Sequence, residues 1–261
     1  MMSAKPLAMM VKKITGVTVM SALALSLWFS NVTPALAAAD NEPAADAQTL
    51  QAFHASYRVT RGGSEYGDAQ RELQRQGKEL WRYRTLTDIS WFILSDKREF
   101  TSSFVVRDGA VINREFAYKR TGTGSDKAFS ARFDEQQQQI INLADQQPLD
   151  IPWQVPMMDE SSMLHQLKLD LLNGEQQRFE YQAIDDKGRL DHFTFVRDGV
   201  ENLNLPYGKV DAILIKRIRE NSSRETHYWF APSLNYVLVK LRQWKDGDEQ
   251  ATLELVDYQQ Q

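Results

Sequence analysis

The chain has 261 residues, of which 35 are acidic and 31 basic, and a formal net charge of −4. A mildly acidic chain without runs of Lys and Arg argues against binding to nucleic acid or to anionic membrane surfaces, because both favour clustered cations. The chain contains no Cys, which excludes disulfides, a Cys nucleophile and the lipid-modified type of export signal.

The N-terminal segment is typical of a secretory signal. Its features are Lys5, Lys12 and Lys13, the apolar run 14–29 and the small-residue cleavage box Ala35-Leu36-Ala37. An uncleaved membrane anchor is the alternative, but small polar residues dilute the apolar run and the cleavage box follows it. We therefore predict a signal peptide at 1–37, a disordered lead-in at 38–49 and location in the periplasm.

From residue 50 onward, apolar and polar side chains alternate in short segments that are separated by turn residues, which is typical of antiparallel strands. Segment 66–76 is polar and predicts an edge strand or a solvated ribbon. Segment 89–94 is the most apolar window after the signal and predicts a strand buried on both faces. The alternative is that Trp91 and Phe92 line a cavity or lie exposed on a concave sheet face.

A single helix is predicted after an irregular connection at 147–156, which contains three prolines and Trp153. Asp159 or Ser161 can cap its start, and Asn173-Gly174 predicts a left-handed end. The apolar stripe that this helix must bury consists of Leu164, Leu167, Leu171 and Leu172. The concave face of the sheet is the expected partner of that stripe.

The last quarter of the chain reads as an antiparallel meander over 205–256. Asn221, Pro232 and Asp246-Gly247 mark its turns, because they favour tight turns or remove a ladder donor. The predicted fold class is mainly β: a large curled antiparallel sheet, or open half-barrel, packed over one amphipathic helix. The predicted organisation is a single β-rich domain over 50–261.

Motifs for catalysis or metal binding are missing from the sequence. The four His residues lie far apart, without a second ligand at metal-binding spacing, and no Gly-x-Ser-x-Gly elbow occurs. We therefore predict no metal, no cofactor and no enzymatic activity. The 35 acids leave open a hydrolase that acts on envelope glycan or lipid through an unmarked carboxylate pair.

Aromatic residues offer the remaining indication of function. Strand aromatics are ordinarily core, but a curled sheet over a helix can also enclose an apolar ligand. Trp91, Phe92 and Trp153 are the candidate ligand-binding residues, for a lipid-like ligand or an envelope protein. A structural or assembly role through an edge strand is a further alternative. We expect a monomer with no nucleic-acid partner and no transmembrane segment after signal cleavage.

Three segments near the C-terminus carry a family resemblance. Residues 205–208, 229–232 and 236–240 resemble the Thr-Pro-x-Gly turn, the Trp-x-Ala-Pro strand end and the Tyr-x-Pro-Val-Lys strand of a bacterial family, domain of unknown function 3108. Leu205 replaces the Thr of the first motif and Leu238 replaces the Pro of the last motif. The resemblance implies an exported, mostly antiparallel β protein without an established active residue. More distantly, it implies a shape similar to that of periplasmic lipoprotein carriers.

Overall fold

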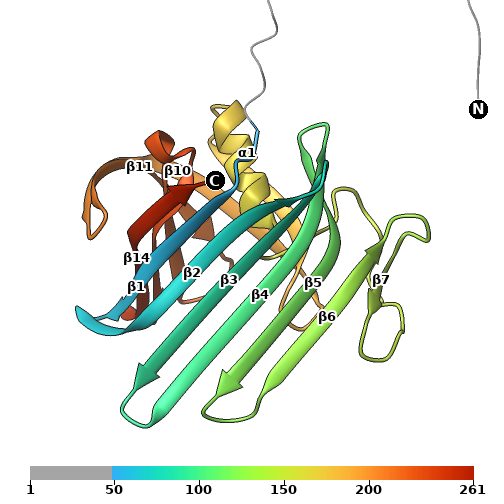
Figure 1. Ribbon diagram of the computed structural model, residues 1–261, viewed down its shortest axis with the longest axis horizontal. Helices are drawn as coiled ribbons and strands as arrows, with labels where there is room; N and C mark the ends of the chain where they lie inside the picture. The colour runs from blue at the N-terminus through green and yellow to red at the C-terminus, as the bar shows by residue number, and fades with distance from the viewer. Residues whose placement is uncertain (1–48) are drawn as a thin grey trace, which may run out of the picture. The chain divides into compact units, whose positions relative to one another are not determined.

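The computed structural model describes residues 49–261, so the predicted signal peptide at 1–37 and nearly all of the lead-in at 38–49 lie outside the described residues. The described part of the chain forms one curled sheet of 14 strands and one α-helix, α1 (Figure 1). Among these residues, no helix has the length and apolar character needed to cross a membrane. The predicted fold class is confirmed.

The strands run from the middle of the sheet to one edge as β1 to β7, and from the other edge back to the middle as β8 to β14. From one edge to the other they are β7 (Gln139–Asn142), β6 (Lys127–Asp134), β5 (Ala110–Gly122), β4 (Leu94–Arg107), β3 (Leu80–Trp91), β2 (Ser64–Gln76), β1 (Phe53–Arg61), β14 (Asp248–Gln260), β13 (Val237–Lys245), β12 (Arg224–Ala231), β11 (Gly208–Ile218), β10 (Leu190–Leu205), β9 (Arg178–Ile184) and β8 (Met158–Asp159). All neighbours are antiparallel except β8 and β9. The first and last strands pair in the middle, and the predicted C-terminal meander is confirmed.

Alternation along each strand decides which side chains face the concave side. In β1, Phe53 and Tyr57 are buried on that side, whereas Arg58 and Thr60 point to the convex side. The turn predicted at Asp246-Gly247 is present. It joins β13 to β14, and its two residues have positive φ angles of 54° and 83°. The core lies on the concave side because the large apolar residues occupy the alternate strand positions that face that side.

Segment 66–76 is not an edge strand, so that prediction is wrong. It belongs to β2, which is hydrogen-bonded to β1 on one side and to β3 on the other. The true edges are β7 and β8. The segment reads as polar because Arg71, which occupies an inward position between Ala69 and Leu73, is a charged residue where an apolar one is expected.

Segment 89–94 is not a doubly buried strand either. Strand β3 ends at Trp91, whose backbone pairs with Leu94, and the two residues between them form the turn into β4. Phe92 and Ile93 are 89% and 94% exposed. Apolar composition alone did not reveal this turn because neither residue is a usual turn former.

Helix α1 (Met163–Asn173) packs against the concave side of the sheet, as predicted, and buries Leu167 and Leu171. Its C-terminal end differs from the prediction. Gly174 has an extended backbone at φ −161°, not the left-handed conformation. The helix therefore runs directly into extended chain that leads to β9.

Asp159 ties the β8 edge and the start of α1 to the opposite part of the sheet. Its carboxylate accepts hydrogen bonds from the backbone N–H groups of Ser161 and Ser162, each at 2.8 Å. It also accepts from the Ser102 hydroxyl of β4 at 2.8 Å and from the side-chain amide of Asn113 in β5. Burial raises the pKa of Asp159 to about 6, while these hydrogen bonds act in the opposite direction.

A second, smaller apolar cluster forms where the two ends of the sheet approach each other. Phe116, Phe133 and Ile184 are buried in it, so β9 contacts the face of β5 and β6. The turn between β9 and β10 comes so close that a Cβ on Gly188 would lie 2.5 Å from the Phe129 ring of β6. Side chains thus bridge the two halves of an open sheet.

Candidate functional site

A small cavity lies between α1 and the concave face of the sheet. Its volume is about 20 Å³, which is enough for one water-sized group. The polar lining comes from three neighbouring strands and from the helix: Tyr57, Arg71, Tyr83, His165 and Lys168. Strand pairing brings the first three residues side by side, and the helix places the last two above them.

Lys168 is the most unusual residue of this lining. It is only 2% exposed, and its ammonium group makes no hydrogen bond within the described residues. Its nitrogen lies 5.3 Å from the centroid of the Phe53 ring, which offers a weak cation–π contact. Burial lowers the pKa of Lys168 to about 8, so the side chain is still mostly protonated near neutral pH.

Arg71 brings a second positive charge to the cavity. Its guanidinium donates a hydrogen bond to the Tyr83 hydroxyl at 3.3 Å and lies 5.6 Å from the centroid of the Tyr57 ring. The Tyr57 hydroxyl donates to the carbonyl oxygen of Leu238 at 2.8 Å. Both phenols are therefore held in place by the strands, and the Arg71 charge is contacted by neutral groups only.

His165 completes the polar lining in its neutral form. The ring is packed edge to face against Tyr83, with centroids 4.2 Å apart, and stacks on Phe104 at 5.4 Å. Both ring nitrogens are buried without a hydrogen bond among the described residues. Burial, followed by repulsion from Lys168 and Arg71, lowers its pKa well below the ordinary value.

The charge balance of the cavity is one-sided. Lys168 and Arg71 are both cationic near neutral pH, and none of the described residues that line the cavity is acidic. An unpaired buried charge costs several kcal/mol unless an opposite charge or hydrogen bonds compensate it. The lining therefore presents positive charge without a counter-charge among the described residues, and the unpaired nitrogens of His165 add unused hydrogen-bonding capacity.

The rim of the cavity is apolar. Leu164 of the helix and Tyr236 between β12 and β13 are half-buried, and both lie at the cavity beside buried Phe230 and Leu238. An anion that reached Lys168 past this rim would have apolar side chains along its path. This combination of one charged end and an apolar approach suits an amphiphilic ligand.

The side-chain hydrogen bonds that join the helix to the sheet lie on one side of it. Gln166 accepts a hydrogen bond from the Val111 backbone N–H at 2.7 Å, and Asp170 accepts one from the Tyr181 hydroxyl at 2.5 Å. Gln166 also donates to Asp170 at 2.9 Å. These polar contacts lie on the side of β5 and β9, whereas the side that carries Leu164 and Lys168 has no hydrogen bond to the sheet among the described residues.

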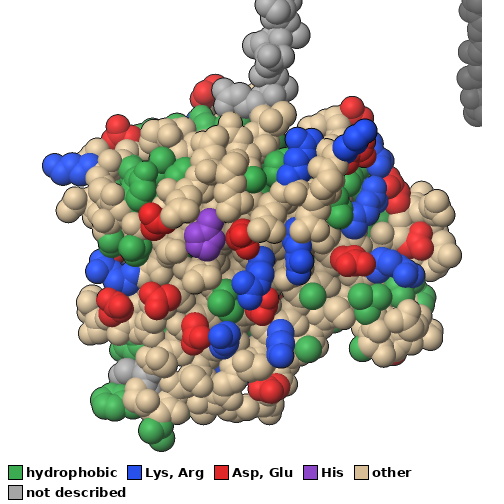
Figure 2. Space-filling model, viewed as in Figure 1, with side chains coloured by type: hydrophobic (Ala, Val, Ile, Leu, Met, Phe, Trp, Pro, Cys, Tyr) green, Lys and Arg blue, Asp and Glu red, His purple; other side chains and the backbone are tan. Residues whose placement is uncertain are grey.

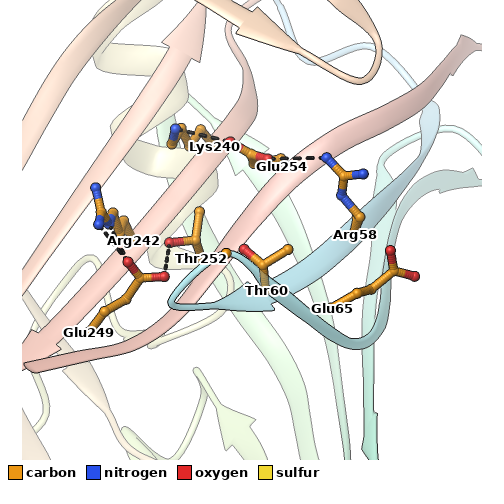
Figure 3. Close-up of a pocket in the computed structure, with 9 residues that line it drawn as sticks. Arg58, Thr60, Glu65, Lys240, Arg242, Glu249, Thr252 and Glu254 are labelled. Atoms are coloured by element: carbon orange, nitrogen blue, oxygen red, sulfur yellow. Dashed lines mark hydrogen bonds and ion pairs between the residues drawn. The ribbon is translucent and has the colours of Figure 1, made fainter.

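A larger groove of about 310 Å³ lies on the convex face, across β13, β14 and β1 (Figure 3). Its charges pair with each other. Glu254 lies 3.0 Å from Lys240 and 3.5 Å from Arg58, and Glu249 accepts from Arg242 at 3.0 Å. These interactions occupy both carboxylates, whereas the Nε atom of Arg58 makes no hydrogen bond among the described residues.

The acids of this groove do not resemble a glycosidase pair. The pKa of Glu249 is lowered by its hydrogen bonds to Arg242 and Thr252, which outweigh its partial burial, whereas a general acid needs a raised pKa. Asp159 does have a raised pKa, but four donors occupy its carboxylate. Neither location offers an acid and a free carboxylate facing each other.

Comparison with known proteins places the chain in a family. The family model described as "Protein of unknown function (DUF3108)" matches residues 56–255. The chain belongs to the DUF3108 family. A search of curated proteins finds no significant match.

Solved structures similar to this DUF3108 protein share its fold at low sequence identity. A "Beta-barrel-like Protein of Domain of Unknown Function DUF1849" from Brucella abortus is 12% identical, with a TM-score of 0.54, and the match covers 81% of this chain and 98% of that chain. Aeromonas veronii immune modulator A is 9% identical over 78% of this chain and 75% of that chain, and its TM-score of 0.22 supports no argument. The first match extends the curled-sheet fold beyond DUF3108.

The structure places two of the predicted ligand-binding residues, Phe92 and Trp153, away from the cavity. Phe92 lies in the exposed turn between β3 and β4, and the side chain of Trp91 beside it lies outside what the structure describes. Trp153 is half-buried against the second apolar cluster. Neither Phe92 nor Trp153 lines the cavity under α1.

Sequence reasoning missed Lys168, His165 and Arg71, although Lys168 and Arg71 each carried a signal. Lys168 is four residues after Leu164 and three before Leu171, so it falls within the apolar stripe of the helix. Arg71 has the inward phase of its strand. A charged residue at a position that periodicity assigns to the core is the pattern that could have identified this site.

Proposed function

We propose that this protein is an exported, non-enzymatic binding protein of the bacterial envelope, whose ligand is an amphiphile with a small anionic head, such as a long-chain carboxylate. The N-terminal segment with features of a secretory signal supports export to the periplasm. The similarities to the DUF3108 and DUF1849 families support the fold only, so the role of the protein has to be inferred from the residues of the site.

The observation that carries this proposal is the buried, unpaired ammonium of Lys168. Lys is among the residues least often buried without a partner. Here a second cation, the partly buried Arg71, lines the same cavity, which raises the cost of keeping the Lys168 charge out of water. A bound anion would offset that cost, whereas an uncharged ligand would not.

The dimensions of the cavity favour a carboxylate head over a larger one. A volume of about 20 Å³ admits one or two oxygen atoms, because a single water needs roughly 10–15 Å³. A phosphate, with more oxygens around a larger centre, would require the surrounding side chains to move further. The Lys168 ammonium and the Arg71 guanidinium are both suited to pairing with a carboxylate.

An apolar tail has to pass the rim formed by Leu164 and Tyr236. The cavity is too small for the tail, since small-molecule pockets usually measure about 300–1,000 Å³. Binding therefore requires α1 to move away from the β12–β13 side of the sheet. The helix can do so as a hinge, because its hydrogen bonds through Gln166 and Asp170 lie on the opposite side.

The test compares three ligands that share one alkyl chain: dodecanoate, dodecyl phosphate and dodecanol. Calorimetric titration should show the tightest binding for dodecanoate and weak binding for dodecanol. Lys168→Met should weaken dodecanoate binding at least about tenfold, because a buried charge pair is typically worth 2–5 kcal/mol or more. Its effect on dodecanol should be small.

Lys240→Met is the matched control. Lys240 is also a lysine near an aromatic ring, but it lies on β13 and is ion-paired with Glu254 on the convex side. Dodecanoate binding should stay within about twofold of the wild-type value. Equal binding of dodecanol and dodecanoate, or an unchanged affinity in Lys168→Met, would overturn the proposed function.

A further inference from the structure

The turn between β3 and β4 exposes three consecutive apolar side chains. Phe92 and Ile93 are 89% and 94% exposed, and Leu94 is 46% exposed; we call these three residues the β3–β4 tip. In Figure 1 this hairpin reaches the lower left end of the sheet, and Figure 2 shows apolar side chains gathered at its end. Contiguous exposed apolar residues on a monomer generally mark an interaction site.

The chemistry of this turn differs from that of comparable turns in the same sheet. Asp108–Gly109 and Asp246–Gly247 also join strands through two residues, and they use the polar residue and glycine that favour positive φ. The β3–β4 tip instead places Phe92 at φ 53°, a conformation that bulky residues rarely adopt. An apolar side chain at this position is therefore unfavourable both because it is exposed to water and because its backbone has a positive φ.

The size of the tip argues for a lipid bilayer as its partner. Three side chains expose at most a few hundred Å², whereas specific protein–protein interfaces bury roughly 1,200–2,000 Å² in total. A second copy of this chain would therefore gain too little contact from the tip. Shallow insertion into the boundary between lipid headgroups and acyl chains needs only a few apolar residues.

The charged residues next to the tip would lie at the level of the lipid headgroups if the tip were inserted into a bilayer. Asp96 follows Leu94 by two residues, or about 7 Å of strand, and apolar groups of surface-bound segments typically reach about 5–10 Å into a bilayer. Asp96 pairs with both Arg98, at 2.8 Å, and Arg120, at 3.1 Å. Asp186 also lies near enough to act electrostatically on Arg98, so this group of paired charges is close to neutral and can remain at the level of the polar headgroups while the apolar tip enters the acyl boundary.

We propose that the β3–β4 tip inserts into the interfacial region of a phospholipid bilayer and holds the protein on the membrane surface. The net charge of −4 does not favour adsorption of the whole chain, so the apolar tip provides the attraction. The tip is separate from the cavity under α1. Tyr83, at the cavity, and Trp91, at the end of β3, are eight residues apart on one strand, which corresponds to about 26 Å.

The lack of Cys in the chain allows a site-specific test on the whole protein. Ile93→Cys labelled with an environment-sensitive fluorophore should show blue-shifted emission and protection from aqueous iodide when vesicles of phosphatidylethanolamine and phosphatidylglycerol are added. The control is Glu79→Cys, an exposed position in the β2–β3 turn at the other end of β3. Its emission should not change.

A second substitution tests whether the apolar side chain itself drives insertion. Phe92→Ser in the labelled Ile93→Cys background should weaken vesicle partitioning about tenfold or more, because burying a Phe side chain contributes enough for a factor of that size. Equal shifts at positions 93 and 79, or no shift at position 93, would overturn the proposal. A shift at position 93 that needs no vesicles and grows with protein concentration would also overturn it, because it would identify a second copy as the partner.

Discussion

Single residues under α1 combine binding capacity with a cost in stability. The Lys168 ammonium is buried beside neutral rings and a second cation, Arg71, without a carboxylate in the cavity lining. Replacement of a buried charge by an apolar side chain of similar volume is often neutral or stabilising. The same residue that we expect to attract the ligand should therefore make the ligand-free protein less stable.

Lys168→Met should raise the free energy of unfolding of the ligand-free protein by about 1–3 kcal/mol at pH 7. Urea denaturation measures this change. Lys240→Met, which removes a partly exposed ion pair with Glu254, should change it by less than about 1 kcal/mol. Destabilisation by Lys168→Met would mean that the lysine supports the fold, and it would contradict the assigned role.

The stability of the ligand-free protein should also depend on pH through Lys168. Its pKa of about 8 lies below the ordinary value of 10.5, so between these pH values the unfolded chain binds more protons than the folded one. The free energy of unfolding of the wild type should therefore rise, relative to Lys168→Met, as the pH increases from about 8 to 10. Dodecanoate affinity should fall over the same range because the cation is lost.

At the scale of elements, Asp159 helps to hold the edge strand β8 and the start of α1 in place, although β8 is only two residues long. One carboxylate accepts hydrogen bonds from the backbone of Ser161 and Ser162, in the turn just before α1. It also accepts hydrogen bonds from Ser102 and Asn113 on the far strands. Strand β8 pairs with β9 through only two residues. The position of the helix over the sheet thus depends on this side chain as well as on the buried leucines.

Asp159→Ala should lower the free energy of unfolding by about 2–4 kcal/mol, because it leaves buried donors on two strands and at the helix start without an acceptor. Ser102→Ala removes only one of these donors and should cost about 1 kcal/mol. Urea denaturation of the two variants at the same pH gives both values. Equal losses would show that the carboxylate acts through Ser102 alone.

At the scale of the whole described sheet, curvature brings distant strands together without closing them into a barrel. Strands β7 and β8 are the free edges, but Ile184 of β9 is buried among residues of β5, β6 and β7. The turn after β9 also contacts the β6 ring of Phe129 at Gly188. Side-chain packing, not hydrogen-bonded pairing, joins the two halves.

Gly188→Ala tests this contact. Gly188 has a φ of +73°, and a Cβ there would lie 2.5 Å from Phe129, so the substitution should lower the free energy of unfolding by about 2–3 kcal/mol. Gly77→Ala is the control, because Gly77 has a φ of +74° and nothing within 4 Å of the added atom. It should cost only about 1 kcal/mol.

Comparable losses of stability in the two glycine variants, measured by thermal or urea denaturation, would mean that the contact with Phe129 contributes little. The curl of the sheet would then have to be maintained by the second apolar cluster and by Asp159. A larger loss at Gly188 would show that the turn between β9 and β10 is closely packed against β6.

The sequence by itself determined the strands, most of the turns, the single helix and the family. Two-residue alternation around Phe53 and Tyr57, turn residues such as Asp246-Gly247 and the leucine stripe of α1 are local patterns, and each depends on neighbours within a few positions. Local patterns failed at 66–76, where Arg71 occupies an inward position, and at Phe92, where an apolar residue forms a turn.

Only the tertiary structure decided which residues meet. Periodicity shows that Arg71 and Lys168 face inward, but it does not show that a strand near the start of the chain and a helix nearly a hundred residues later place these charges in one cavity. Strand order, curl and helix placement arise from contacts between distant parts of the chain. The candidate binding site is a product of those long-range contacts, which is why Phe92 and Trp153, selected from the sequence, lie elsewhere.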